Sequence, residues 1–356
     1  MFYTRDKARI SADVAQINLT SGEIFDFAPI EIIPTTNGYT GTQQMFSCAL
    51  LPDGYFWVDS QQGKIFLFAS EQPKEISMQG FFNFFADNLK QYNAINSDNT
   101  FNYDGVTVAY DNRYKRILAT FKQNANTPNY KYFTMSYSSY ANQGKGAWVS
   151  FHDYDPDYMF STRKNVISFK DGKLYIHNNP TNRGLYYDDN KASSYIDVPF
   201  NPNSIPSFSN GKRVYKDTSV YLDSINWNSN FTKLNGVNDL YKTINYLTVR
   251  NQHQHSGKIL LDYDTNLIKD TNTRNAETKW YCNSFRNLVK DKNEPFIKDI
   301  FSNFEVINGN IDSLLPWFEQ EAMNNRWFIV RFEYDNIGDY KMILHSVDIN
   351  KTDSFR

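Results

Sequence analysis

A chain of 356 residues is long enough for two or three domains, each with its own core. The formal net charge of −2 excludes a strong overall field that would draw the chain to DNA or to anionic lipid. Aromatic residues make up 17% of the chain, and Asn, Asp, Ser and Thr are abundant. This composition is typical of short strands joined by turns, so it predicts an all-β protein.

The two cysteines, Cys48 and Cys282, lie far apart in the sequence. They favour buried free thiols over a disulfide framework, as in a protein made in a reducing compartment. No apolar run approaches the ~20 residues of a membrane span. The N-terminus, MFYTRDKARI, lacks the apolar core of a signal peptide. We therefore expect a soluble protein without a membrane segment.

Residues 1–33 are mostly polar and contain one short strand pattern, IFDFAPIEII. Three strand patterns follow, MFSCALL, YFWVD and KIFLF, with turn residues at each break. An amphipathic helix is predicted near 78–92, because several apolar residues recur there at helical spacing. Its strongly aromatic face favours a place in the core over a ligand site, and its members are Phe81, Phe82, Phe84, Phe85 and Leu89.

From Gly105 the strand patterns resume with VTVAYD, RILATF and YKYFTMSYS. AWVSF, YMFS, NVISF and LYIH follow, and a hairpin turn at Asp171–Gly172 joins the last two. Together these patterns form roughly three sheets of three or four strands between about residues 34 and 200. Large flat side chains can fill the wedge between radially packed sheets. We therefore predict a β-propeller-like domain at 34–212, which residues 1–33 enter or complete.

The predicted propeller is incomplete within this chain. A propeller normally has four to eight blades, and the strand count gives about three and a half. An open arc would leave two apolar sheet faces in water, which favours aggregation. We therefore predict that another polypeptide, or another copy of this chain, completes the ring.

Residues 197–212 carry three prolines and several Ser and Asn residues, so they indicate a linker or a long edge loop. Beyond them, longer patterns such as SVYLDSINW, WFIVRFEYD and KMILHSVDIN alternate apolar and polar residues. Alternation places one face of a sheet in the core and the other in water. We predict a β-sandwich-like domain at 213–356, with a short helix interrupted at Pro316.

Two groups of residues are candidate metal sites. His253 and His255 alternate and would share one face of a strand, with Asp262 and Asp264 on the next run. The segment HDYDPD, from His152 through Asp153 and Asp155 to Asp157, carries carboxylates that Ca²⁺ prefers. However, neither group has a complete ligand set, so solvated histidines and an Asp-rich turn are the favoured interpretations. No metal site and no cofactor are predicted.

No sequence motif for a nucleophile, a phosphate-binding loop or a zinc protease occurs. A pair of glycosidase carboxylates stays open, because the fold rather than spacing would bring them together. Tryptophans can form a platform for sugars, but a place in the core is favoured for each of Trp57, Trp148, Trp227, Trp280, Trp317 and Trp327. We predict no catalytic residues. A carbohydrate-binding or carbohydrate-cleaving β-propeller acting on host surface glycans remains the alternative, and a receptor-binding adhesin is a third possibility.

Several stretches together resemble the muzzle proteins of crAss-like bacteriophages. They are LPDGYFWVDSQQGKIFLF, GFFNFFADNL, VTVAYDNRYKRIL, GAWVSFHDYDPDYMFSTRKNVISFKDGKLYIHN, NAETKWYCNSFRNLV, WFIVRFEYDN and KMILHSVDIN. These stretches cover much of the chain in the same order, and the run around WVSFHDYDPDYMF is the most specific of them. Muzzle proteins are typically longer, and this chain resembles their C-terminal portion.

The resemblance implies a non-enzymatic component of the virion, made in the cytoplasm of the host bacterium. It would form part of the distal tail, as a six-fold ring around the DNA channel, and help to block or gate genome exit. Its implied partners are other tail proteins, other copies of itself, and an N-terminal portion or other chain that completes the propeller. DNA would pass it without specific binding, for which a near-neutral charge is suitable.

Overall fold

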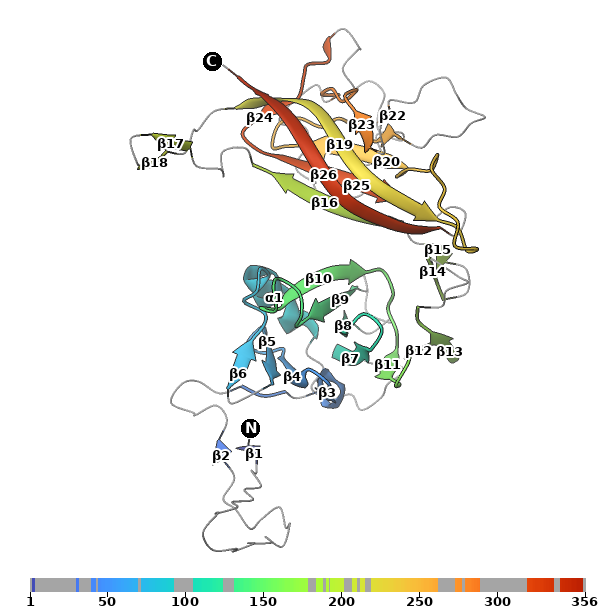
Figure 1. The fold of residues 1–356 in the computed structure, drawn as a ribbon. Helices are drawn as coiled ribbons and strands as arrows, with labels where there is room; N and C mark the ends of the chain where they lie inside the picture. Colours follow the sequence, from blue (N-terminus) through green and yellow to red (C-terminus); the bar gives the residue numbers. More distant parts are fainter. Residues whose placement is uncertain are drawn as a thin grey trace, which may run out of the picture. The chain divides into compact units, whose positions relative to one another are not determined.

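The computed structural model confirms an all-β protein built of several antiparallel sheets. Most of the residues in segment 1–33 and the region around Pro316 lie outside the part of the chain that the structure describes. The described residues are 2–3, 30–31, 40–42, 44–69, 72–92, 105–123, 131–178, 184–187, 190–191, 193–201, 207–209, 212–214, 219–261, 273–276, 279–288, 319–335 and 340–354. The chain forms two compact units, Met1–Asn178 and Asn179–Arg356, whose elements are labelled in Figure 1. No helix among the described residues is long and apolar enough to cross a membrane.

The first unit contains three antiparallel sheets, each built from consecutive strands (Figure 1). The first sheet comprises β3 (Cys48–Leu51), β4 (Gly54–Asp59), β5 (Lys64–Phe68) and β6 (Pro73–Glu75). The second comprises β7 (Gly105–Asp111), β8 (Arg116–Lys122), β9 (Tyr132–Ser138) and β10 (Ala147–His152). The third comprises β11 (Tyr158–Ser161), β12 (Val166–Lys170) and β13 (Lys173–Ile176). A short pair precedes them, β1 (Phe2–Tyr3) with β2 (Ile30–Glu31).

The second sheet lies between the other two. Its first strand, β7, is buried along its whole length and contacts both β3 and β11. The first strands of the three sheets are therefore neighbours, which is the relation between the inner strands of propeller blades. The predicted hairpin at Asp171–Gly172 is confirmed, because both residues have positive φ angles (50° and 76°), as a two-residue type I′ turn requires.

The predicted helix is present but shorter, as α1 (Phe82–Asn88) followed by a 3₁₀ turn at Leu89–Tyr92. Residues 77–80 form a turn instead. The aromatic face belongs to the core, as predicted: Phe85 is fully buried, and its ring lies 4.9 Å from that of Trp148. Phe82 is the exception, at 50% exposure.

In the second unit two antiparallel sheets pack face to face. One has the order β16 (Ser194–Phe200), β25 (Phe328–Tyr334), β20 (Tyr246–Arg250) and β21 (Ile259–Leu260). The other contains β22 (Thr273–Ala276), β23 (Lys279–Cys282), β19 (Val220–Thr232), β24 (Asn324–Asn325) and β26 (Lys341–Asp353), which pairs with β19. Ring contacts join the two sheets, Trp227 with Phe332 at 5.6 Å and Phe231 with Tyr334 at 5.2 Å. Two short hairpins complete the unit, β14 (Leu185–Tyr186) with β15 (Asn190–Lys191) and β17 (Ser207–Ser209) with β18 (Lys212–Val214).

The segment 197–212 differs from the predicted linker, because its first residues belong to β16 and pair with β25 in the second unit. Asp197 in β16 binds the guanidinium group of Arg331 through two hydrogen bonds of 2.7 and 2.8 Å. Pro199 is tolerated because β16 is an edge strand, where no ladder bond on the outer side is needed. The domain ranges 34–212 and 213–356 stay predictions, although β16 joins the second unit.

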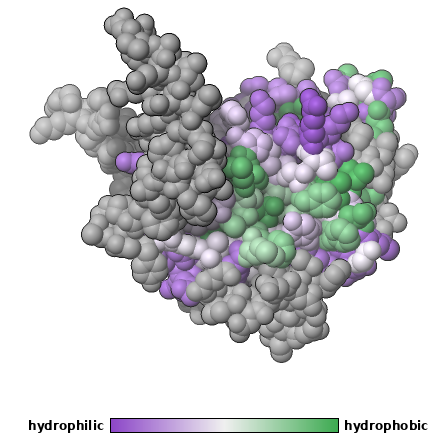
Figure 2. Space-filling model, turned by 90° about the horizontal axis from the view of Figure 1, so that it is seen from below, coloured by the Kyte–Doolittle hydropathy of each residue, from purple (hydrophilic) through white to green (hydrophobic). Residues whose placement is uncertain are grey.

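Both cysteines are free thiols, as predicted; Cys282 is buried, and Cys48 is half-buried. Burial raises the pKa of the Cys282 thiol, which keeps it protonated. Hydrophobic residues also reach the surface, where Figure 2 shows them as adjoining green areas. In the first unit Leu50 is 83% exposed, and Leu174 and Ile176 are each 60% exposed.

Candidate functional site

The histidines considered as metal ligands do not share a strand face. Strand β20 ends at Arg250, and the chain then turns, held by the Asn251 side chain, which accepts hydrogen bonds from the backbone N–H groups of His253 and Gln254. His253 is exposed, whereas the His255 Nδ1 accepts a hydrogen bond from the Gly257 N–H at 2.9 Å. Asp262 and Asp264 lie outside the described residues. Across the described ranges, no three His, Cys, Asp or Glu side chains gather closely enough to hold a metal ion.

Two carboxylates of the HDYDPD segment, those of Asp155 and Asp157, bind lysines. Asp157 accepts a hydrogen bond from the Lys122 ammonium group at 2.8 Å, and Asp155 accepts one from Lys170 at 2.8 Å. The Lys122 side chain is only 5% exposed, and its burial lowers its pKa although Asp157 opposes this effect. Lys122 ends β8 and Asp157 precedes β11, so this ion pair ties the second sheet to the third.

Four of the six tryptophans are core residues. Four are at most 8% exposed, namely Trp57, Trp148, Trp227 and Trp280. Trp327 is half-buried, and Trp317 lies outside the described residues. A sugar platform needs the face of an exposed ring. The four buried tryptophans therefore cannot form one.

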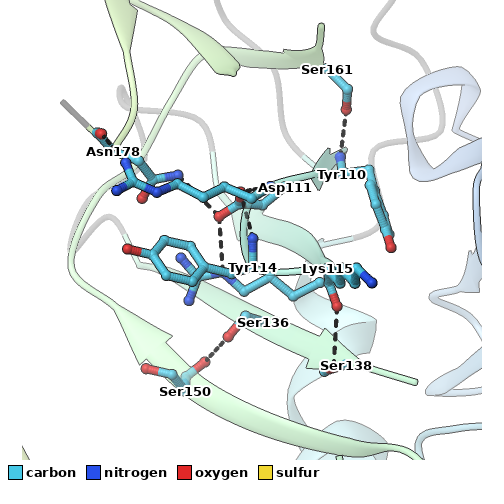
Figure 3. A network of polar contacts seen from close by, with 11 residues as sticks. Tyr110, Asp111, Tyr114, Lys115, Ser136, Ser138, Ser150, Ser161 and Asn178 are labelled. Carbon is cyan, nitrogen blue, oxygen red and sulfur yellow. Dashed lines mark hydrogen bonds and ion pairs between the residues drawn. The ribbon is translucent and has the colours of Figure 1, made fainter. Parts of the chain in front are cut away.

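A buried carboxylate, Asp111, organises one end of the second sheet (Figure 3). It ends β7 and is 1% exposed. One oxygen accepts hydrogen bonds from the backbone N–H groups of Arg113 (3.1 Å) and Tyr114 (3.4 Å) in the turn that follows. The other oxygen accepts bonds from the Arg116 Nε (3.1 Å) and the Asn178 Nδ2 (3.0 Å). The four donors saturate the carboxylate and compensate for its burial.

Asn178 follows β13, so its bond to Asp111 joins the second sheet to the third. Two further contacts do the same: the Arg113 Nη1 donates to the Asn178 carbonyl at 2.9 Å, and the Tyr110 N–H donates to the Ser161 hydroxyl at 2.5 Å (Figure 3). Asn112 also donates to the Thr162 carbonyl at 2.8 Å. All of these contacts lie at the end of the sheets where β7 turns into β8.

Asp53 makes the corresponding connection between the first and second sheets. It lies in the turn between β3 and β4. Its two oxygens accept hydrogen bonds from the hydroxyl groups of Tyr110 and Ser139, each at 2.8 Å. Burial and the bond to Asp53 raise the pKa of the Tyr110 hydroxyl well above its usual value, so this donor stays protonated. Each pair of neighbouring sheets is thus joined by a carboxylate at a turn.

Two histidines are enclosed between the second and third sheets. The Tyr154 ring lies 5.2 Å from that of His152 and 4.8 Å from that of His177, and His177 is hydrogen-bonded to Ser168 at 2.7 Å. Burial, together with the positive charge of Arg116, lowers the pKa of His152 to about 3 and that of His177 to about 4. Both rings are therefore neutral at pH 7.

Chemically, this arrangement fixes sheets against one another. Its carboxylates accept hydrogen bonds from amides, hydroxyl groups, a guanidinium group and lysines, and these bonds fix the positions of the sheets that carry the donors. Composition and spacing did not single out Asp53 or Asp111. A signal is nevertheless present, because each Asp stands at the end of a strand pattern, in LPDG and in AYDNRYKR, where a turn residue is expected.

Residues 10–172, which include Asp53, Asp111 and the HDYDPD segment, match the family described as Crassvirus muzzle protein. This part of the chain, somewhat less than half of it, is similar to the muzzle protein family. The resemblance inferred from the sequence is thereby confirmed, and the family indicates a structural tail protein of a phage, with other virion proteins as partners. A search of curated proteins finds no match to the chain.

The muzzle family match covers the first and second sheets completely and ends at Gly172, in the hairpin of the third. The run WVSFHDYDPDYMF lies inside the match, and it carries His152, Asp155 and Asp157. The C-terminal stretches that resemble muzzle proteins, such as WFIVRFEYDN, lie beyond the match, so their relationship stays a prediction.

Proposed function

We propose that the chain is a structural component of the distal tail of a tailed phage. In this role it forms part of the muzzle ring around the DNA channel and helps to block or gate genome exit. The observation that carries the proposal is the match of residues 10–172 to the Crassvirus muzzle protein family. The construction of the first unit supports it, because three sheets tied together by buried polar contacts suit a protein that must persist without turnover.

In this proposal the three sheets of the first unit are blades of a propeller that this chain does not complete. The contacts of β7 with β3 and β11 support it, because neighbouring inner strands are the hallmark of blade packing. The missing blades come from other copies of the chain in a six-fold ring, or from an N-terminal portion or another tail protein. The two units correspond to a propeller-like and a sandwich-like domain of one C-terminal muzzle portion.

The proposed role needs no catalysis, and the polar side chains described above support a non-enzymatic protein. Asp53, Asp111, Asp155 and Asp157 are each engaged by donors that hold sheets together. The formal charge of −2 suits a channel wall past which DNA slides, since dense phosphate contacts would retain it. Such a protein is synthesised in the host cytoplasm and resides in the virion.

Labelling of purified phage particles tests this proposal. An antibody against the chain, detected by gold particles in electron micrographs, should mark the tip of the tail. Label on peripheral fibres would indicate an adhesin instead. Absence of the chain from purified particles, as measured by mass spectrometry, would refute a structural role. A glycan array and a polysaccharide depolymerisation assay complete the test, because turnover lost on changing a carboxylate pair would establish the glycan-directed alternative.

A further inference from the structure

One end of the second and third sheets carries four exposed cations. Arg113 and Lys115 lie in the turn between β7 and β8. Arg163 and Lys164 lie in the turn between β11 and β12, and all four residues are exposed. The two turns are neighbours, because the side chain of Asn112 donates a hydrogen bond of 2.8 Å to the backbone of the other turn. Cations from two distant segments of the chain are thereby brought together.

None of the four cations forms an ion pair with a carboxylate of the described residues. The opposite end of the same two sheets differs, because two lysines there are paired. Lys122 at the end of β8 binds Asp157, and Lys170 at the end of β12 binds Asp155, each at 2.8 Å. Charges at that end therefore compensate one another within the chain, whereas the four cations remain available to an external anion.

The carboxylates that lie near the four cations are engaged by other donors. Asp111 is 1% exposed, and Arg116 balances its charge through an ion pair of 3.1 Å. Both oxygens of Asp53 accept hydrogen bonds from hydroxyl groups. Asp53 is thus left to oppose the four exposed cations, and this end of the sheets carries an excess of positive charge.

Two exposed tyrosines lie among the cations. Tyr114 is 55% exposed and Tyr140 is 62% exposed. The Arg113 guanidinium lies 5.6 Å from the ring centroid of Tyr114, and the Lys115 ammonium lies 5.3 Å from that of Tyr140. The Lys115 carbonyl accepts a hydrogen bond from the Ser138 hydroxyl at 3.1 Å (Figure 3). These contacts hold two of the cations in place. We call this surface the basic end; it comprises Arg113, Tyr114, Lys115, Tyr140, Arg163 and Lys164.

We propose that the basic end binds the phosphate backbone of DNA without reading its sequence. Arg and Lys side chains without a carboxylate partner attract phosphates, and tyrosine hydroxyls donate hydrogen bonds to phosphate oxygens. Contacts to phosphates carry no sequence information directly, which suits a protein past which a whole genome moves. Because the cations are few, the contact is weak and depends on salt, so it holds DNA without trapping it. The inference rests on the proposed role beside the DNA channel and names the surface that meets the DNA.

The experiment measures the fluorescence anisotropy of a labelled DNA duplex of about 20 base pairs with the purified full-length chain, at roughly 50–200 mM NaCl. The wild-type chain should bind two duplexes of unrelated sequence equally well, and log K should fall with log salt with a slope of about −3 to −4, as for four phosphate contacts. Arg163→Ala/Lys164→Ala should weaken binding roughly tenfold or more and reduce the slope by about 2. Lys90→Ala/Lys131→Ala is the matched control, because it removes the same charge from exposed positions elsewhere in the first unit and should retain the wild-type affinity. Circular dichroism confirms that every variant is folded.

Three results would overturn the inference. The first is a wild-type chain that binds neither duplex at the lowest salt concentration. The second is an equal loss of affinity in the two double variants, which would indicate a diffuse effect of net charge. The third is tighter binding of polygalacturonate, a polymer of carboxylated sugars, which would identify an anionic glycan as the partner instead. Because the assay uses the isolated chain, all three results leave the proposed virion location standing. Gold label on peripheral fibres would refute that location without altering the measured affinity for DNA.

Discussion

Replacing Asp111 by alanine should selectively destabilise the first unit. The substitution removes four hydrogen bonds at once and leaves the Arg116 guanidinium and the Asn178 amide without their acceptor. The Asp111 and Arg116 side chains are only 2% and 21% exposed, so water compensates poorly. Removing one partner of a buried ion pair typically costs about 3–5 kcal/mol, and this is the loss we expect in the free energy of unfolding.

Hydrogen exchange followed by mass spectrometry suits this prediction, because it reports each unit separately. Peptides from β7, β8 and β13 should exchange faster in Asp111→Ala, whereas peptides from β19 in the second unit should not change. Asp111→Asn retains one acceptor oxygen and should cost roughly half as much, since hydrogen bonds to a charged group are worth about 1.5–3 kcal/mol. Asp87→Ala, at an exposed position of α1, is the control and should stay within about 0.5 kcal/mol of the wild type. Equal effects of Asp111→Ala and Asp87→Ala would refute the reasoning.

Three further predictions concern other contacts. His152 and His177 have folded pKa values of about 3 and 4, below the unfolded value near 6.5, so the unfolded chain binds more protons in this window. The contribution of the two histidines to the free energy of unfolding of the first unit should therefore be fully present above pH 6.5 and be lost as the pH drops toward 4. The urea concentrations at the midpoint of unfolding at pH 7 and pH 5 measure this loss. The double variant His152→Gln/His177→Gln should show a smaller difference between the two pH values. Lys122→Met should lower the free energy of unfolding by about 2–4 kcal/mol, because it leaves Asp157 without its ammonium partner. The double variant Lys122→Met/Asp157→Leu should recover much of this loss, and a double-mutant cycle tests the recovery. Trp227→Ala should lower the free energy of unfolding of the second unit by about 3–5 kcal/mol, because the ring is fully buried there. Hydrogen exchange should become faster in the second unit alone. Faster exchange in the first unit would contradict the division into two units.

Strand patterns could be predicted from the sequence because each is short, aromatic or β-branched, and bounded by turn residues. YFWVD and KIFLF became β4 and β5, and the Asp171–Gly172 turn has the φ angles that its residue types favour. The helix began later than predicted because periodicity alone does not locate the turn that precedes Phe82. The aromatic run suggested that Phe82 lies in the core, yet its position on the helix leaves it half exposed.

The pairing partners of strands could not be predicted, since they depend on long-range contacts. β16 joins β25 across more than a hundred residues, and Asp197 finds Arg331 only once both strands are in register. The prolines of 197–212 suggested a linker, but an edge strand accommodates Pro199 without losing a ladder bond.

The polar sites of the first unit could be recognised as turns but not as joints between sheets. The local sequence places Asp53 and Asp111 at the ends of strands. From such a position an Asp side chain is expected to bond only to the backbone of its own turn. Instead, each carboxylate accepts a donor from a neighbouring sheet, Tyr110 for Asp53 and Asn178 for Asp111. Apolar packing alone specifies which faces meet but tolerates sliding, whereas these directional bonds fix the position of one sheet along the next.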